Sequence, residues 1–210
     1  SMISGMRASS NIPNMSAFSD VATAGFYVAL RVGFAYPIEE RNALPPAWVE
    51  RYTLRGLMIQ DPVIRWVYEN NGAARWSEIR LEDPRNVMEQ ARRFDLNFGV
   101  AVSYVEGAAA GQRSYASFAR SDREFTDSEI CSLEAGLIAL HDDRRPPSNL
   151  TKAELEALRM VKDGLLMKEI ADMLQVTEGA VKQRLKNAKV KLKAKNGTHA
   201  ATMATSFGLI

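Results

Sequence analysis

The sequence is short of the residues on which covalent cross-links, metal sites and enzyme centres depend. Its 210 residues include one cysteine and two histidines, namely Cys131, His141 and His199. One cysteine excludes a disulfide within a single chain, and the three residues lie in separate segments, so no nucleophile, base and orienting residue can be assembled. We therefore expect no enzyme activity, no metal and no cofactor. Cys131 falls among apolar residues of a predicted helix, where we expect a small buried thiol.

Long apolar runs and phosphate-binding glycine loops are also missing. The longest apolar stretch, residues 24–37, is interrupted by Arg31 and is too short to span a bilayer. The first twenty residues lack the basic and then apolar plan of a secretory signal. We expect a cytoplasmic protein that does not associate with membranes.

Charge divides the chain into two unequal parts. Residues 150–210 hold 11 Lys or Arg and six acids, whereas the residues before them hold 16 and 19. Residues 142–149 combine charge, adjacent prolines and turn residues, which is typical of a linker. The sequence thus predicts a poorly defined segment 1–23, a domain over 24–141, a linker over 142–149 and a second domain over 150–210.

The second domain has the pattern of three short helices. Thr151 and Glu154 form a capping box at the start of the first helix, and Gly164 suits a left-handed cap at its end. Thr177 is the natural N-cap of the third helix. The short break over 174–176 indicates a helix-turn-helix.

The third of these helices has a core stripe beside a cationic stripe. The core stripe recurs at helical spacing and consists of Val181, Leu185, Ala188 and Leu192. From Lys182 to Lys195 there are seven Lys or Arg and no acid. The alternative interpretation is a lysine-rich helix that is merely solvated. The position of the helix after a capped helix pair instead favours binding to a polyanion, and to double-stranded DNA in particular.

Residues 150–210 resemble the C-terminal DNA-binding domain of the LuxR family. The shared pattern is Leu-Thr-x-x-Glu, a glycine after the first helix, Lys-Glu-Ile-Ala, and Val-Lys at the start of the reading helix. The resemblance implies an all-α four-helix domain. Its fourth helix, formed by His199, Ala200, Ala204 and residues 208–210, would be a dimerising element.

The resemblance also implies which residues contact DNA. The reading helix would run over 177–193, with Gly179, Lys182 and Lys186 toward base edges. The candidates for phosphate contact are Lys168, Thr177 and Arg184. Lys189, in the cationic stripe, is a further candidate for DNA contact. Relatives often carry a polar side chain at the position of Gly179, so direct readout here depends on lysines, which read guanine less rigidly than arginine. We expect a homodimer on a roughly palindromic site.

The first domain has mixed periodicity. Helices are predicted over 45–58, 84–94 and 127–140, the last opened by a capping box of Thr126 and Glu129. Strands are predicted over 25–36, 100–105 and 114–120, with a hairpin around 107–111. This order favours an α+β domain in which one antiparallel sheet lies between helical layers.

Four residues of this domain have an informative spacing: Trp48, Tyr52, Asp61 and Trp76. Singly, an aromatic pair one helical turn apart is typical of a core, and Asp-Pro is typical of a turn. Together, and upstream of this helix-turn-helix, they resemble the acyl-homoserine lactone sensor domain of quorum-sensing LuxR regulators.

This second resemblance implies a ligand site with assigned roles. Trp48 would donate its indole N–H to the lactone carbonyl, and Asp61 would accept from the ligand amide N–H. Without a ligand, Asp61 would be a poorly satisfied buried charge. Tyr52 and Trp76 would form aromatic walls. The remaining candidates, for the tail and the acyl group, are Val63, Leu57, Phe98 and Ser117.

The chain departs from the family pattern in two places. Leu44 stands where relatives often have a tyrosine, and one extra residue near 117–122 would turn Ser117 to the opposite face of its strand. The ligand is therefore an unusual acyl-homoserine lactone, another small amphiphile, or absent. The rival function is a ligand-independent regulator or an antagonist that pairs with a related subunit, which the short N-terminal part favours slightly.

Overall fold

A computed structural model describes residues 14–33, 36–107 and 111–210. The chain forms two compact units that meet in sequence at Arg144 and Arg145, and each is described by itself. Within the described ranges, no helix is both long and apolar enough to cross a membrane.

The N-terminal unit is built around one five-stranded sheet in the order β2-β1-β5-β4-β3. The strands are β1 (Gly25–Val32), β2 (Glu39–Asn42), β3 (Gly72–Arg75), β4 (Phe98–Val105) and β5 (Arg113–Arg120). The pairs β1–β2, β3–β4 and β4–β5 are antiparallel, and the β4–β5 register runs without interruption from Phe98↔Arg120 to Val105↔Arg113. The predicted hairpin is thus confirmed, although residues 108–110 of its connection lie outside the described residues.

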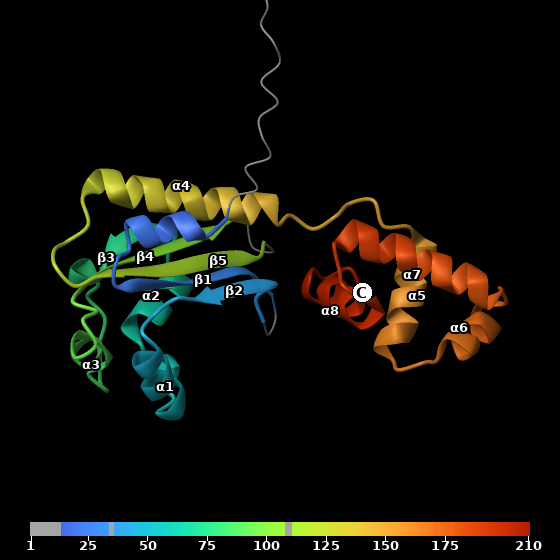
Figure 1. The fold of residues 1–210 in the computed structure, drawn as a ribbon, viewed down its shortest axis with the longest axis horizontal. Coiled ribbons are helices and arrows are strands. Elements are labelled where there is room, and N and C mark those ends of the chain that lie inside the picture. The colour runs from blue at the N-terminus through green and yellow to red at the C-terminus, as the bar shows by residue number, and fades with distance from the viewer. Residues whose placement is uncertain (1–13, 34–35, 108–110) are drawn as a thin grey trace, which may run out of the picture. The chain divides into compact units, whose positions relative to one another are not determined.

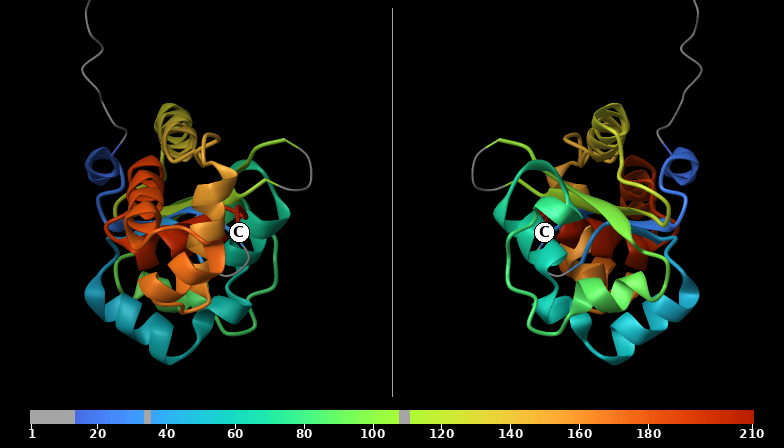
Figure 2. Two further views of the ribbon diagram at one scale, coloured as in Figure 1. Left: turned by 90° about the vertical axis from the view of Figure 1, so that its right-hand side faces the viewer. Right: turned by 90° about the vertical axis from the view of Figure 1, so that its left-hand side faces the viewer.

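Helices cover both faces of this sheet. One face carries η1 (Ser16–Asp20) and α4 (Asp127–Asp143), and the opposite face carries α1 (Pro46–Leu54), α2 (Pro62–Glu69) and α3 (Val87–Arg92) (Figures 1 and 2). Two single turns, η2 (Leu57–Gln60) and η3 (Trp76–Glu78), complete the unit. The predicted antiparallel sheet between helical layers is confirmed.

The α4 face holds the main core. The capping box of Thr126 and Glu129 is present, and α4 buries Leu133, Leu137 and Leu140 at helical spacing. The prediction for Cys131 is wrong, because this thiol is exposed. It precedes Leu133 by two residues, which places it about 200° around the helix from the buried stripe.

Two predicted helices are shorter in the structure than the sequence indicates. The first ends at Leu54, and Gly56 turns into the left-handed region with φ +58°. The second begins only at Val87, because the Asp83 carboxylate accepts from the backbone N–H groups of Val87 and Met88 at 2.8 and 2.9 Å. Asp83 thus caps the helix from four residues upstream of its first residue.

The helix α2, the strands β2 and β3 and the short helices η1 and η3 were not predicted. The Asp61-Pro62 pair is not a simple turn: Asp61 is the N-cap of α2 and Pro62 is its first residue, which is a favourable place for proline. The strands β2 and β3 have four residues each and no alternation of buried and exposed residues. Nothing in their local sequence therefore marks them as strands.

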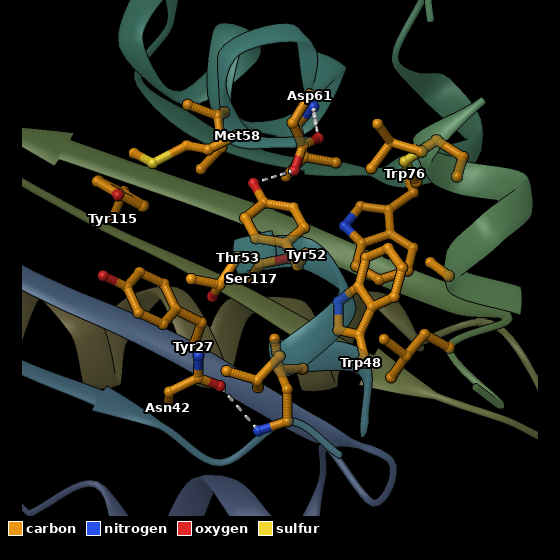
Figure 3. Close-up of a pocket in the computed structure, with 18 residues that line it drawn as sticks. Tyr27, Asn42, Trp48, Tyr52, Thr53, Met58, Asp61, Trp76, Tyr115 and Ser117 are labelled. Carbon is orange, nitrogen blue, oxygen red and sulfur yellow. Dashed lines mark hydrogen bonds between the residues drawn. The ribbon is translucent and has the colours of Figure 1, made fainter. Parts of the chain in front are cut away.

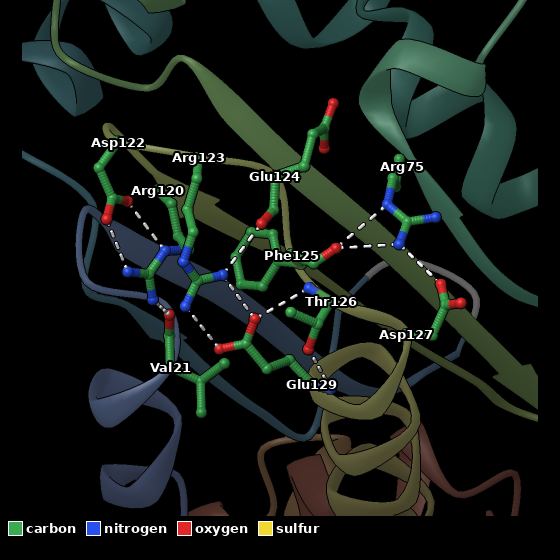
Figure 4. A network of polar contacts seen from close by, with 10 residues as sticks. All are labelled: Val21, Arg75, Arg120, Asp122, Arg123, Glu124, Phe125, Thr126, Asp127 and Glu129. Carbon is green, nitrogen blue, oxygen red and sulfur yellow. Dashed lines mark hydrogen bonds and ion pairs between the residues drawn. The ribbon is translucent and has the colours of Figure 1, made fainter.

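Ion pairs between arginines and acids hold the loop between β5 and α4 (Figure 4). Arg120 binds both carboxylate oxygens of Asp122 at 2.9 Å, and this lowers the pKa of Asp122 to about 2. Arg123 binds Glu129 in the same two-pronged way, at 2.8 and 3.1 Å. Such paired geometry stabilises the loop through fixed orientation more than through the strength of one exposed ion pair.

The C-terminal unit is a four-helix domain, as predicted. Its helices are α5 (Lys152–Lys162), α6 (Met167–Leu174), α7 (Glu178–Leu192) and α8 (Gly197–Ser206). The Thr151 capping box is present, and Gly164 has the expected positive φ of +83°. Residues 208–210 follow α8 and are not part of it, because Gly208 has left the helix with φ +72°.

Candidate functional site

A cavity of about 220 Å³ lies between the sheet and the helices α1, α2 and α3. Its walls are mostly apolar, with a few polar groups, which is the usual composition of a small-molecule site. The structure brings together six of the eight residues that the sequence suggests for the ligand. These are Trp48, Tyr52, Asp61, Val63, Trp76 and Ser117.

Asp61 is the buried acid of this cavity, with 9% of its surface exposed. Its Oδ1 accepts from the backbone N–H of Val63 at 2.8 Å, and its Oδ2 accepts from the Tyr52 hydroxyl at 2.7 Å (Figure 3). Burial raises the pKa of Asp61, and these hydrogen bonds offset only part of that effect. The prediction that Asp61 is a poorly satisfied buried charge without a ligand is corrected in part, since each carboxylate oxygen already has a donor but neither donor carries a charge.

Two indoles lie beside Tyr52 in the cavity (Figure 3). Trp48 on α1 packs against the Tyr52 ring with centroids 5.5 Å apart, and the nitrogens of both indoles turn toward the side where Tyr52 and Ser117 lie (Figure 3). Trp76 Nε1 is buried and has no hydrogen-bond partner among the described residues. A buried donor without an acceptor is uncommon, so Trp76 is a candidate for ligand contact.

The Trp76 indole lies directly on Gly99 of β4. A Cβ on Gly99 would come within 2.0 Å of the indole ring, so any side chain there would displace Trp76 from the cavity. The glycine thus permits the close approach of an aromatic ring to the strand.

Ser117 faces the cavity from β5, opposite Ala101 of β4. The uninterrupted β4–β5 register places Ser117 on the cavity side, and the one-residue shift considered from the sequence does not occur. Leu44, which replaces the tyrosine of many relatives, also lines the cavity. That position therefore contributes an apolar wall and no hydroxyl.

The two additional tail candidates do not line the cavity. Leu57 is fully buried in a core cluster with Trp48 and Leu96, and Phe98 lies at the start of β4 without reaching the cavity. Sequence reasoning missed four polar residues that do line it: Tyr27, Asn42, Thr53 and Tyr115. Tyr115 was accessible to prediction, because residues two apart on a strand share a face and Tyr115 precedes Ser117 by two.

The second candidate site is the exposed face of α7. Val181, Leu185, Ala188 and Leu192 are buried as predicted, which leaves the neighbouring cationic stripe outside. Five of the seven residues predicted to contact DNA are exposed, and Arg184 and Lys189 are half-buried. The exposed residues are Lys168, Thr177, Gly179, Lys182 and Lys186. The cations among them form no ion pair with an acid in the described parts of the chain. Thr177 caps α7 by accepting from Ala180 N–H at 3.1 Å.

Lys191 differs from the other lysines of α7. Its Nζ lies 2.6 Å from Glu154 Oε1 and 2.9 Å from the Asn149 carbonyl oxygen. Burial alone would raise the pKa of Glu154, but the hydrogen bonds from Lys191 and Thr151 outweigh it and lower that pKa. Lys191 therefore joins α7 to the start of α5, and it is not a free cation for DNA.

Comparisons with known proteins identify both parts of the chain. Residues 37–144 match the autoinducer binding domain family, and residues 148–204 match the bacterial regulatory proteins of the luxR family. The chain belongs to the LuxR family. It is thus a LuxR-type DNA-binding transcription regulator with an autoinducer-binding domain and a C-terminal helix-turn-helix, and this family is not enzymatic.

Individual LuxR relatives match over most of their length. The quorum-sensing regulator RhlR of Pseudomonas aeruginosa is 29% identical over 210 residues, covering 91% of this chain and 86% of RhlR. The regulatory protein SdiA of Escherichia coli is 29% identical over 178 residues, covering 79% of this chain and 74% of SdiA. A crystal structure of Escherichia coli SdiA aligns with a TM-score of 0.50 at 25% identity, over 95% of this chain and 94% of that one.

Proposed function

We propose that the cavity binds an acyl-homoserine lactone or a similar small amphiphile and that this binding controls DNA recognition. The observation that carries the proposal is the convergence of Trp48, Trp76 and Asp61 on one mostly apolar cavity. An amphiphile with a polar head and an apolar tail needs such a site.

The polar groups suit the head of such a ligand. Trp48 donates its indole N–H to the lactone carbonyl, and the unpartnered N–H of Trp76 offers a second donor. Asp61 accepts from the ligand amide with the lone pairs that Tyr52 and Val63 leave free. Val63 contacts the tail, and the Ser117 hydroxyl contacts the acyl group.

A thermal-shift panel of acyl-homoserine lactones of graded chain length tests this proposal. A ligand at a hundred times its dissociation constant stabilises the folded protein by about 2.7 kcal/mol, which corresponds to a shift of roughly 5–10 °C. Such a shift with at least one lactone supports the proposal. A well-folded protein that no lactone stabilises would overturn it.

The second half of the proposal concerns DNA. Two copies of α7, brought together as a homodimer, read a roughly palindromic site through Gly179, Lys182 and Lys186. On a site selected from a random library, we expect Lys182→Ala to weaken binding about tenfold more than on random DNA. Lys195→Ala is the control. We expect this exposed lysine to contact only phosphates, so its loss should weaken binding to the selected and the random DNA equally. An equal loss on both DNAs for Lys182→Ala would contradict its base-reading role.

We also propose boundaries for the two functional domains and the linker. The sensor domain, expected from residue 24, also includes η1, because Phe18 packs against Phe26 and Phe118, and the DNA-binding domain covers 150–210. Because α4 continues to Asp143, the linker between them begins two residues later than the sequence indicates.

A ligand-independent regulator or antagonist is the second candidate function. It is favoured by Asp61, because both carboxylate oxygens already have protein donors in the absence of a ligand. A heterodimer with a related subunit, together with the absence of any lactone-induced shift, would support this alternative.

A further inference from the structure

Two tyrosines lie beside Met58 at the end of the cavity opposite the indoles (Figure 3). Tyr27 and Tyr115 lie on one side of the cavity and the two indoles on the other, with Tyr52 and Ser117 between them (Figure 3). The two tyrosines come from neighbouring strands, β1 and β5, and their ring centroids are 6.0 Å apart. A tail that extends from the indoles across the cavity therefore ends against phenol rings.

The hydroxyl of Tyr27 has a protein partner and can still accept a hydrogen bond. Tyr27 donates its hydroxyl hydrogen to Glu40 Oε2 at 2.6 Å, so its oxygen is left as an acceptor. Tyr115 is only 4% exposed, and the centroid of its ring lies 6.0 Å from that of Tyr27 and 5.6 Å from that of Tyr68. Burial raises the pKa of both Tyr27 and Tyr115, so both remain neutral hydroxyls at every physiological pH.

Asn42 adds a third polar group at this end. It pairs with Tyr27 in the β1–β2 ladder, and residues paired across a ladder project from the same face of a sheet. Its Oδ1 accepts from Leu44 N–H at 3.1 Å, whereas its amide N–H groups make no hydrogen bond to the described residues. Asn42 thus presents a donor beside an acceptor from Tyr27.

A plain alkyl tail suits this end poorly. It can neither donate nor accept a hydrogen bond, so it would leave unused the spare acceptor of Tyr27 and the amide donor of the exposed Asn42. The cavity of about 220 Å³ is also below the usual range of roughly 300–1,000 Å³ for ligand pockets. A short tail therefore fills it.

We infer that the ligand has a short tail with a hydroxyl or carbonyl oxygen near its far end, recognised by Tyr27, Tyr115 and Asn42. This inference rests on the proposed function and names the ligand class for the same cavity. It divides the cavity into a head site at the indoles and Asp61 and a tail site at the tyrosines.

A matched pair of ligands tests the tail site in the full-length protein. The pair is N-hexanoyl-homoserine lactone and its ω-hydroxyhexanoyl analogue, which share the head and the chain length. Isothermal titration should show the hydroxylated ligand binding about tenfold more tightly, as expected for one satisfied hydrogen bond to a buried group.

Three conservative variants locate the effect. Tyr115→Phe and Tyr27→Phe each remove one hydroxyl and should reduce the preference for the hydroxylated ligand to about twofold or less. Tyr104→Phe makes the same chemical change on β4, outside the cavity, and should keep the tenfold preference. Tyr27 is half-buried, so Tyr27→Phe provides a folded variant if Tyr115→Phe does not fold.

The outcomes separate this inference from the proposed function. Equal or tighter binding of the plain hexanoyl ligand to the unmodified protein overturns the tail site and leaves lactone binding intact. A preference that persists unchanged in both cavity variants also overturns it. Binding of neither ligand, and of no other lactone, overturns both proposals together.

Discussion

Each half of the molecule has one deeply buried carboxylate, and the two are treated in opposite ways. Glu154 is 3% exposed and meets the ammonium of Lys191, whereas Asp61 is 9% exposed and meets only a hydroxyl and a backbone amide. The pKa of Glu154 is lowered and that of Asp61 is raised. A charged partner fixes Glu154 as a structural group, while neutral partners leave Asp61 able to bind another donor.

The largest expected effect comes from breaking the charged pair. Lys191→Met leaves the Glu154 carboxylate buried without a counter-charge and should destabilise the C-terminal unit by about 3 kcal/mol. The three tryptophans, Trp48, Trp66 and Trp76, all lie in the N-terminal unit. Urea unfolding followed by far-UV circular dichroism should therefore shift while the tryptophan fluorescence transition does not.

A double variant controls for the loss of packing. Adding Glu154→Gln to Lys191→Met removes the unpaired charge and should restore most of the lost stability. If the double variant is no more stable than Lys191→Met, the pair does not act through charge.

The next effect concerns the neutral partners. Asp61→Asn should change the stability of the free protein little, since the Tyr52 hydroxyl can turn from donor to acceptor. It should abolish most of the ligand-induced stabilisation of about 2.7 kcal/mol at a hundredfold excess over the dissociation constant. A fluorescence melt with and without lactone measures both quantities, and an undiminished ligand shift in the variant would refute the role of Asp61 in binding the head group.

The two acids should also give opposite dependences of stability on pH. Because the folded pKa of Glu154 is lowered, its contribution is fully present above the ordinary value of about 4.3 and is lost as the pH falls through the folded pKa. Because the folded pKa of Asp61 is raised, its contribution is present below the ordinary value of about 3.9 and is lost as the pH rises through the folded pKa. Unfolding at several pH values, compared with Glu154→Gln and Asp61→Asn, should show slopes of opposite sign, and equal signs would contradict the comparison.

The smallest effect is expected at an exposed pair. Arg123 is 46% exposed where it binds Glu129, and Glu129 still caps Thr126 without it. Arg123→Ala should therefore lower the melting temperature by no more than about 2 °C. A much larger loss would mean that the surface arginines of Figure 4 stabilise the unit as strongly as a buried pair.

Local patterns in the sequence predicted the C-terminal unit well. The capping residues Thr151 and Thr177, the glycine at 164 and the buried stripe of α7 each depend on neighbours within one or two helical turns. The partner of Lys191 is 37 residues away in the sequence. No local pattern distinguishes this paired lysine from the free ones beside it.

The cavity was predictable only in part. Resemblance of spacing located Trp48, Tyr52, Asp61 and Trp76, but a continuous apolar run such as β1 does not reveal which of its residues faces a cavity. Tyr27 and the support of Trp76 by Gly99 depend on how distant strands and loops pack. The short strands β2 and β3 likewise exist only because longer neighbours pair with them.

DNA binding measured with and without a lactone that stabilises the protein tests the central claim most directly. Fluorescence anisotropy on a selected duplex should show that the lactone changes the affinity of the full-length protein several-fold in one direction, and that Asp61→Asn removes this change while leaving the unliganded affinity intact. An affinity that the lactone leaves unchanged, in a protein whose cavity it demonstrably occupies, would contradict the coupling of the cavity to the reading helix.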